Sequence, residues 1–262
     1  MNTIDWEEYV EGRFTQRPLA ATIGVFDGIH KGHRKLIERV LARHPATPVA
    51  FTFTESPKKI LRPSSYSGDI QTRSQKLEGF EALGIELCVL IDFSGNFSKL
   101  TGRDFLSRLH VRDSLESLAV GSDFRCGHRL DTDASAIAEF FKSCGVGVDI
   151  VTHVLLHGHP VSSSRIRSAI SEGRLTDAAD MLGRPFELDL RGSEFVGSDF
   201  GNVRVKRPAT LVLPPAGEYE AVYFDDGGGR ELIVRITKHE IALEGIRGKL
   251  PNRISFQGLA KE

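Results

Sequence analysis

The chain has 262 residues, which is enough for one large domain or for a medium domain followed by a small one. A formal net charge of −1 argues against a protein that binds the nucleic-acid backbone, and three cysteines without a metal-binding spacing argue against a structural metal. Because the amino terminus shows no signal-peptide pattern and no apolar run approaches about 20 residues, we expect a cytoplasmic protein with no membrane partner.

Strand-like and helix-like stretches alternate through the first two thirds of the chain. Runs of apolar and β-branched residues predict strands, whereas apolar residues at helical spacing predict helices. In chain order we expect a strand over 19–26, a helix over 35–44, a strand over 47–54, a helix over 74–84, a strand over 86–93, a helix over 101–110, a strand ending at 121, a helix over 134–145 and a strand over 146–156. This rhythm predicts an α/β fold, Rossmann-like, with a parallel sheet covered by helices on both faces.

The pattern of predicted secondary structure changes in the last third of the chain. Two short helices are expected over 163–173 and 174–185, and short strands separated by turns follow them. We therefore predict a domain boundary near residue 186, with a first domain over 1–186 and a small antiparallel β domain over 187–262. The polar loop over 62–71 is a candidate mobile flap, with an ordinary surface loop as the alternative.

The stretch GVFDGIHKGH, residues 24–33, places three glycines and two histidines between a predicted strand and a predicted helix. Ligands of open α/β sheets bind at the carboxyl ends of strands, and glycines let the backbone approach them closely. A helix that begins here directs free N–H groups toward an anion, and His30 and His33 are spaced to share one side of its first turn. We interpret the stretch as a phosphate-binding loop, with a glycine-rich turn carrying surface histidines as the alternative. Its spacing fits neither the GxGxxG motif nor the P-loop.

A second anion-binding pattern follows the last predicted strand of the sheet. The stretch SSSRIR, residues 162–167, brings three hydroxyls and two guanidinium groups to the start of a predicted helix. Arginine binds phosphate through two parallel hydrogen bonds, and a helix amino terminus favours the same ligand. An N-cap serine with solvated arginines is the alternative, but two such patterns in one chain favour a phosphate site.

Together these motifs resemble the HxGH nucleotidyltransferase superfamily. The chain is most similar to the FAD synthetase (FMN adenylyltransferase) part of bacterial bifunctional riboflavin kinase/FAD synthetases, and the likeness extends over residues 18–186. It rests on GxFDGxHxGH and SSxRIR, and on three further stretches: KLEGFEALGIELCVLIDFSGNFSKLTGRDFL (76–106), AVGSDFRCG (119–127) and AISEGRLTDAADMLGRPFEL (169–188).

The resemblance implies that the phosphate of FMN attacks the α-phosphorus of ATP, giving FAD and pyrophosphate, with Mg²⁺ bridging the phosphates of ATP. The family's catalytic residues would correspond to His30, His33 and Arg167. The implied ATP-binding residues are Gly24, Phe26, Asp27, Gly28, His30, His33, Ser163, Ser164 and Arg167. The implied FMN-binding residues are Phe53, Pro57, Asp123, Phe124 and Arg125, although Asp123 could equally be an ordinary turn aspartate at a strand end.

The sequence departs from the family in two places. The segment TFTESP, residues 52–57, has Glu55 and Ser56 where the family has proline and histidine near the flavin. The tail resembles a riboflavin kinase barrel, yet Pro208, Ala209 and Thr210 are only a scrambled form of its GxPTAN motif. We therefore expect a degenerate barrel without riboflavin kinase activity.

Two other functions remain open on the sequence alone. A flavin or nucleotide sensor could keep the same fold without catalysis, and a related enzyme could transfer a nucleotidyl group to another phosphorylated acceptor. The intact histidines favour an enzyme over a sensor, because a sensor has little need of groups that stabilise a transition state. Nothing in the sequence indicates the oligomeric state.

Overall fold

The computed structural model describes residues 1–14, 18–93, 97–199, 202–225, 227–246 and 250–259, so residues 94–96 of the family-like stretch 76–106 lie outside it. The chain divides into two compact units: Met1–Tyr66 with Lys76–Pro160, and Ser67–Gln75 with Val161–Glu262. The boundary that the sequence predicts near residue 186 falls inside the second unit. Helix α8 (Leu175–Leu182), which precedes this point, packs against a strand of the carboxyl-terminal sheet.

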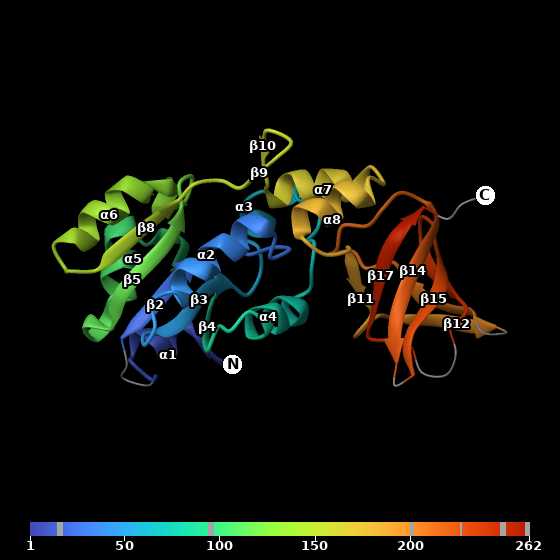
Figure 1. Ribbon diagram of the computed structural model, residues 1–262, viewed down its shortest axis with the longest axis horizontal. Coiled ribbons are helices and arrows are strands. Elements are labelled where there is room, and N and C mark those ends of the chain that lie inside the picture. Colours follow the sequence, from blue (N-terminus) through green and yellow to red (C-terminus); the bar gives the residue numbers. More distant parts are fainter. Residues whose placement is uncertain (15–17, 94–96, 200–201, 226, 247–249, 260–262) are drawn as a thin grey trace. The chain divides into compact units, whose positions relative to one another are not determined.

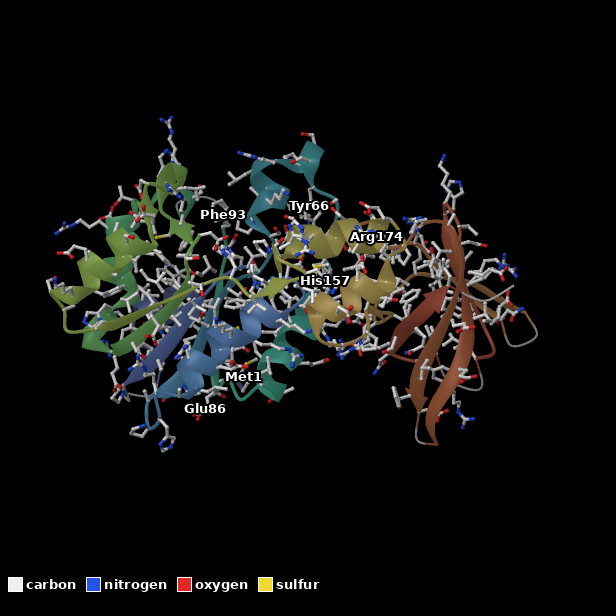
Figure 2. The ribbon with its side chains drawn as sticks, turned by 45° about the horizontal axis from the view of Figure 1, so that its top comes forward. Met1, Tyr66, Glu86, Phe93, His157 and Arg174 are labelled. Atoms are coloured by element: carbon white, nitrogen blue, oxygen red, sulfur yellow. The ribbon has the colours of Figure 1, made fainter. Side chains whose placement is uncertain are left out.

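The first unit is built on a six-stranded sheet in which every neighbouring pair of strands is parallel, which confirms the predicted α/β fold. Strand β1 was not predicted from the sequence; its pairing with β4 places Met1 beside Glu86 (Figure 2). In spatial order the strands are β1 (Asn2–Asp5), β4 (Leu87–Ile91), β3 (Thr47–Phe53), β2 (Leu19–Ile23), β5 (Leu115–Gly121) and β8 (Gly147–Val151).

Helices cover both faces of this sheet, as predicted (Figure 1). On one face α1 (Trp6–Val10), α5 (Gly102–Leu109) and α6 (Ala134–Lys142) pack against large side chains such as Phe51. On the other face α2 (Lys31–Leu41) and α4 (Arg73–Ala82) lie over small residues from four strands, Ala20, Ala50, Cys88 and Ala119. Successive residues of a strand point to opposite faces, so this alternation of large and small residues allows close approach on only one side.

Shorter elements complete the first unit. They are α3 (Pro57–Leu61), the antiparallel pairs β6 (Arg125–Cys126) with β7 (Thr132–Asp133) and β9 (Leu155–Leu156) with β10 (His159–Pro160), and 3₁₀ turns over Pro63–Ser65, Phe97–Lys99, Val111–Asp113 and His128–Leu130. No helix in the described part of the chain is both long and apolar enough to span a bilayer.

The second unit contains α7 (Ser163–Ser171), α8 and a seven-stranded antiparallel sheet. Its core includes the rings of Phe186 and Phe256, which stack with their centroids 5.5 Å apart, and Tyr219, whose ring meets Phe256 edge-on. In spatial order the strands are β11 (Glu187–Asp189), β17 (Arg253–Leu259), β14 (Gly217–Asp225), β15 (Gly228–Ile236), β16 (Glu240–Glu244), β13 (Asn202–Lys206) and β12 (Phe195–Asp199).

Residues 67–75, part of which was a candidate flap, are integrated into this second unit. Asp69 exchanges backbone hydrogen bonds with the strand-like segment at Thr210 and Val212, at 2.8 and 2.9 Å. The hydroxyl of Thr72 donates to the buried carboxylate of Asp189 at 2.6 Å, and the same carboxylate accepts hydrogen bonds from the backbone N–H and the guanidinium of Arg191. The segment is thus fixed through both its backbone and its side chains.

Replacing Asp189 by asparagine is expected to destabilise the protein at pH 7 by about 2 kcal/mol, because charged hydrogen bonds from four donors converge on one buried carboxylate. Burial raises the pKa of Asp189, but hydrogen bonds from Arg191 and Thr72 outweigh it and leave the pKa lowered. A carboxyl group with a lowered folded-state pKa stabilises the fold above its unfolded-state pKa, near 3.9, and loses this contribution as the pH falls through the folded-state pKa.

Urea unfolding at several pH values measures this effect. The difference between wild type and Asp189→Asn should be largest near neutral pH and should shrink below about pH 4. Asp180→Asn, an exposed change on α8 of the same unit, provides the matched control. Equal stability losses for the two variants would contradict the assignment of Asp189 as the centre of this network.

Candidate active site

The loop between β2 and α2 lies at the carboxyl edge of the parallel sheet. Phe93, just beyond the end of β4, marks this edge in Figure 2, and Glu86, just before that strand, marks the opposite edge. Because β2 lies between β3 and β5, the winding of the chain reverses between β2 and β5. Open α/β sheets bind ligands at such a switch point. The candidate segments of this unit follow β2, β3 and β5, three neighbouring strands, so the sheet brings them to one edge.

The backbone of this loop is strained at two residues that are not glycine. Phe26 and Ile29 adopt positive φ angles of 52° and 39°, a conformation that costs on the order of 1–3 kcal/mol per residue. Both side chains are buried, and the ring of Phe26 packs edge-on against that of Phe80 at 5.1 Å. A Cβ on Gly24 would lie 3.2 Å from the Phe26 ring, and Gly28 has a φ of 92°. The glycines therefore admit a turn that the buried side chains hold in place.

The two histidines of the motif stack on each other. Their ring centroids lie 3.6 Å apart with the planes inclined by 16°. The sequence placed both residues in the first helical turn, but His30 is instead the N-cap of α2, and its Nδ1 accepts the backbone N–H of His33 at 3.3 Å. Because Nδ1 accepts this bond, the proton of neutral His30 sits on Nε2. The pair therefore forms one rigid group at the amino end of the helix.

The imidazole of His33 is uncharged at neutral pH. Burial is the main cause that lowers its pKa well below the ordinary value, and electrostatic interactions with His30 and Lys76 lower it further. Its Nδ1 is buried and has no hydrogen-bond partner among the residues that the structure describes. A neutral imidazole can still donate one hydrogen bond, so His33 can bind a phosphate oxygen without bringing a full charge into the site.

A buried lysine supports the loop, a role that sequence reasoning did not assign to it. The ammonium of Lys76, on α4, donates hydrogen bonds to the carbonyls of Val25 and Phe53, at 3.3 and 3.0 Å, and to the hydroxyl of Thr52 at 3.2 Å. These acceptors belong to the loop after β2 and to the end of β3. The only sequence signal was that the family-like stretch 76–106 begins at this lysine.

Two predicted flavin-binding residues lie where β3 ends. Phe53 is the last residue of the strand, and its half-buried ring meets the rings of Phe93 and Phe97 edge-on at 5.8 and 6.3 Å. Pro57 is the first residue of α3, while Glu55 in the altered segment forms an exposed ion pair with Lys59. Phe53 thus lies at the carboxyl side of the sheet with a half-buried ring, whereas Glu55 forms an ion pair on the surface.

The other predicted flavin-binding residues, Asp123, Phe124 and Arg125, follow β5. Asp123 is exposed, and its carboxylate lies 3.2 Å from Nε2 of His153. Phe124 packs against the core, whereas Arg125 is exposed. The following turn is anchored to the start of α5, because the Gly102 N–H donates to Asp131 at 3.0 Å and a Cβ on Gly102 would overlap the Thr132 hydroxyl.

The serine and arginine residues belong to the second unit, at the start of α7. Ser162 is the N-cap, and its hydroxyl accepts the backbone N–H of Arg165 at 3.3 Å, which is the capping role considered above as the alternative. Ser163 and Ser164 are the first two helical residues; Ser163 is half-buried and Ser164 is exposed. Arg167 follows one turn later and is half-buried. This helix end therefore presents hydroxyl groups and a guanidinium together with its own N–H groups.

Comparison with known proteins shows the family of the chain. The family model for FAD synthetase matches residues 13–165. The FAD synthetase of Listeria monocytogenes is 25% identical over 235 residues, which cover 88% of each chain. The bifunctional riboflavin kinase/FMN adenylyltransferase of Escherichia coli is 28% identical over 214 residues, which cover 78% of this chain and 67% of the relative.

A solved structure shares the fold. The crystal structure of a macrolide-efflux protein from Streptococcus pneumoniae matches all of this chain and 91% of its own, with a TM-score of 0.83 at 22% identity. The match to the FAD synthetase model and the names of these relatives place the protein among the nucleotidyltransferases. Because the family match spans more than half of the chain, the protein belongs to the FAD synthetase family, and its enzyme class is FMN adenylyltransferase.

Proposed function

We propose that this protein transfers the adenylyl group of ATP to FMN and that it does not phosphorylate riboflavin. A phosphate oxygen of FMN forms a bond to the α-phosphorus, while the bond from that phosphorus to the oxygen bridging to the β-phosphate breaks. The electron pair of this bond leaves with pyrophosphate, so no covalent enzyme intermediate is needed. The observation that carries the proposal is the stacked pair His30 and His33 at the amino end of α2.

In this reaction the histidines stabilise the transition state rather than transfer a proton. Negative charge increases on the bridging oxygen and spreads over the α-phosphoryl oxygens as the bond breaks. His30 donates from Nε2, and neutral His33 donates from one ring nitrogen, so both meet this charge without a large rearrangement. The N–H groups at the start of α2 add their partial positive charge.

Each substrate contact is assigned to one of the segments described above. Gly24, Phe26, Asp27 and Gly28 shape the nucleotide pocket, because the strained loop brings backbone close to the ligand. Ser163, Ser164 and Arg167 bind the β- and γ-phosphates through hydroxyl, guanidinium and helix N–H groups. We assign flavin binding to Phe53, Pro57, Asp123, Phe124 and Arg125.

Mg²⁺ enters with the ATP in this proposal. Among the described residues no group of three or more histidine, cysteine, aspartate or glutamate side chains could hold a metal ion. Magnesium commonly keeps several waters and binds through substrate phosphates, so such a site fits the residues that are present. When bound, the ion would neutralise charge on the phosphates, and the protein would orient the reacting groups.

Two observations support the absence of kinase activity. Thr210, the last residue of the scrambled motif Pro208–Ala209–Thr210, accepts the backbone N–H of Asp69, so this end of the motif makes a structural contact within the second unit. In addition, the Listeria relative that carries the single name FAD synthetase aligns over 88% of both chains.

Both adenylyl transfer to FMN and the absence of riboflavin kinase activity can be tested by chromatography. The purified protein is incubated with ATP and Mg²⁺, and with either FMN or riboflavin. FAD formed from FMN, with no FMN or FAD formed from riboflavin, is the expected result. A flavin product from riboflavin would contradict the kinase part. No product from either flavin would contradict adenylyl transfer to FMN and would favour another acceptor or a sensor. The His30→Ala/His33→Ala variant, prepared in parallel, controls for contaminating activity.

A further inference from the structure

Lys76 carries a buried cationic side chain in the first unit. Only 9% of its surface is exposed, although a buried ammonium is costly unless its N–H groups are satisfied. Three acceptors meet it: the carbonyls of Val25 and Phe53 and the hydroxyl of Thr52. Helix packing alone would not require a charged side chain at this buried position, so the presence of Lys76 here needs another explanation.

The three acceptors connect two of the segments that form the candidate site. Val25 directly precedes Phe26, the first strained residue of the histidine loop, and Phe53 is the last residue of β3. The Thr52 hydroxyl also donates to the Val25 carbonyl, at 3.1 Å, so this carbonyl receives two hydrogen bonds. The strained loop is therefore clamped to the neighbouring strand immediately before its backbone turns.

We propose that Lys76 is a positioning residue for adenylyl transfer, which holds the loop from Phe26 to His30 against the end of β3 through its bonds to Val25 and Phe53. This inference rests on the proposed function and deepens it. The ammonium also lies close enough to His33 to act on its ionisation, and His30 is the other titratable group that acts on that ring. Lys76 thereby links the geometry of the loop to the charge state of the stacked histidines.

Lys76→Met tests the proposal, because methionine retains an apolar stem of similar length and removes the three hydrogen bonds and the charge. We expect kcat for FAD formation to fall about 100-fold, the cost of a displacement of about 1 Å in a catalytic group. KM for FMN should change by less than about threefold, because most of its assigned contacts lie outside the loop from Phe26 to His30. Lys142→Met, at the exposed end of α6, is the matched control and should leave kcat unchanged.

Thr52→Val provides a second test that keeps Lys76 and removes the other donor to the Val25 carbonyl. We expect Thr52→Val to lower kcat by about tenfold, less than Lys76→Met does. In the double variant the loss of kcat should be clearly less than the product of the two single losses, since both side chains act through one carbonyl. Thermal unfolding of each variant separates these effects from loss of the fold. Full kcat in a folded Lys76→Met protein, or independent effects in the double variant, would overturn the proposal.

Titration of the His33 ring by NMR gives a readout that needs no turnover. Removal of the Lys76 charge should raise the pKa of His33 toward its ordinary value, whereas Lys142→Met should not change it. An unchanged His33 titration in Lys76→Met would show that Lys76 does not act on the histidine pair and would overturn the proposal. If wild type forms no FAD but the His33 titration shifts, the proposed function fails while the placement of Lys76 stands.

Discussion

Replacing both His30 and His33 by alanine is expected to lower kcat for FAD formation by about 10³- to 10⁴-fold while ATP binding stays measurable. One preorganised donor to a developing oxyanion contributes about 10²- to 10³-fold to kcat. The two rings stack at 3.6 Å and share a hydrogen bond through the His33 backbone, so they act as a unit and their losses should not multiply fully. Single-turnover kinetics would measure the chemical step, and calorimetric titration would measure ATP binding.

The experiment must separate two roles of His30, stabilisation of the transition state and capping of α2, because a single substitution can remove both. His30→Ala removes the N-cap of α2 and should also cost about 1 kcal/mol of stability. His30→Ser supplies a hydroxyl that can cap the helix but lacks the imidazole, so it should keep the stability and still lose the rate. His239→Ala, an exposed change in the second unit, is the matched control. Near wild-type turnover in His30→Ser would contradict the catalytic role.

The arrangement of the first unit could be predicted from the sequence because its elements have strong local signals. Buried strands such as Thr47–Phe53 are continuous apolar or β-branched runs, and their alternation with amphipathic helices defines a parallel sheet. The predicted ends of the helices and strands were less accurate. The helix predicted over 35–44 extends over Lys31–Leu41, because His30 caps it, and histidine is not among the usual N-cap residues.

Features that depend on contacts between distant segments could not be predicted. Lys76 lies in a helix with many polar residues and would be assigned to the solvent, yet acceptors 51, 24 and 23 residues away surround it. The positive φ angles of Phe26 and Ile29 likewise depend on burial against α4, which no local pattern reports. Strand β1 has only four residues, mostly exposed, which is too short for a periodic signal.

Arg167→Ala is expected to reduce kcat/KM for ATP by about 10²- to 10³-fold, the second largest effect. In the proposed function its guanidinium binds the phosphates that leave as pyrophosphate, whose charge increases as the bond breaks. Arg167→Lys should recover only part of the rate, because an ammonium keeps the charge but cannot form two parallel hydrogen bonds. Steady-state kinetics with varied ATP would measure both variants. Arg174→Ala is the matched control and should keep full activity; Arg174 is labelled in Figure 2, and its exposed guanidinium pairs with Glu172 and Asp177.

Product inhibition then distinguishes phosphate binding by Arg167 from a structural role in α7. Pyrophosphate should inhibit Arg167→Ala much more weakly than wild type, because the lost group contacts only the leaving part of ATP. Inhibition by FAD should be unchanged, since FAD retains the α-phosphate but neither the β- nor the γ-phosphate. The helix itself should persist, because Ile166, Ala169 and Ile170 form its buried side. An equal loss of affinity for both products would assign Arg167 to the fold of the second unit and would remove it from the phosphate site.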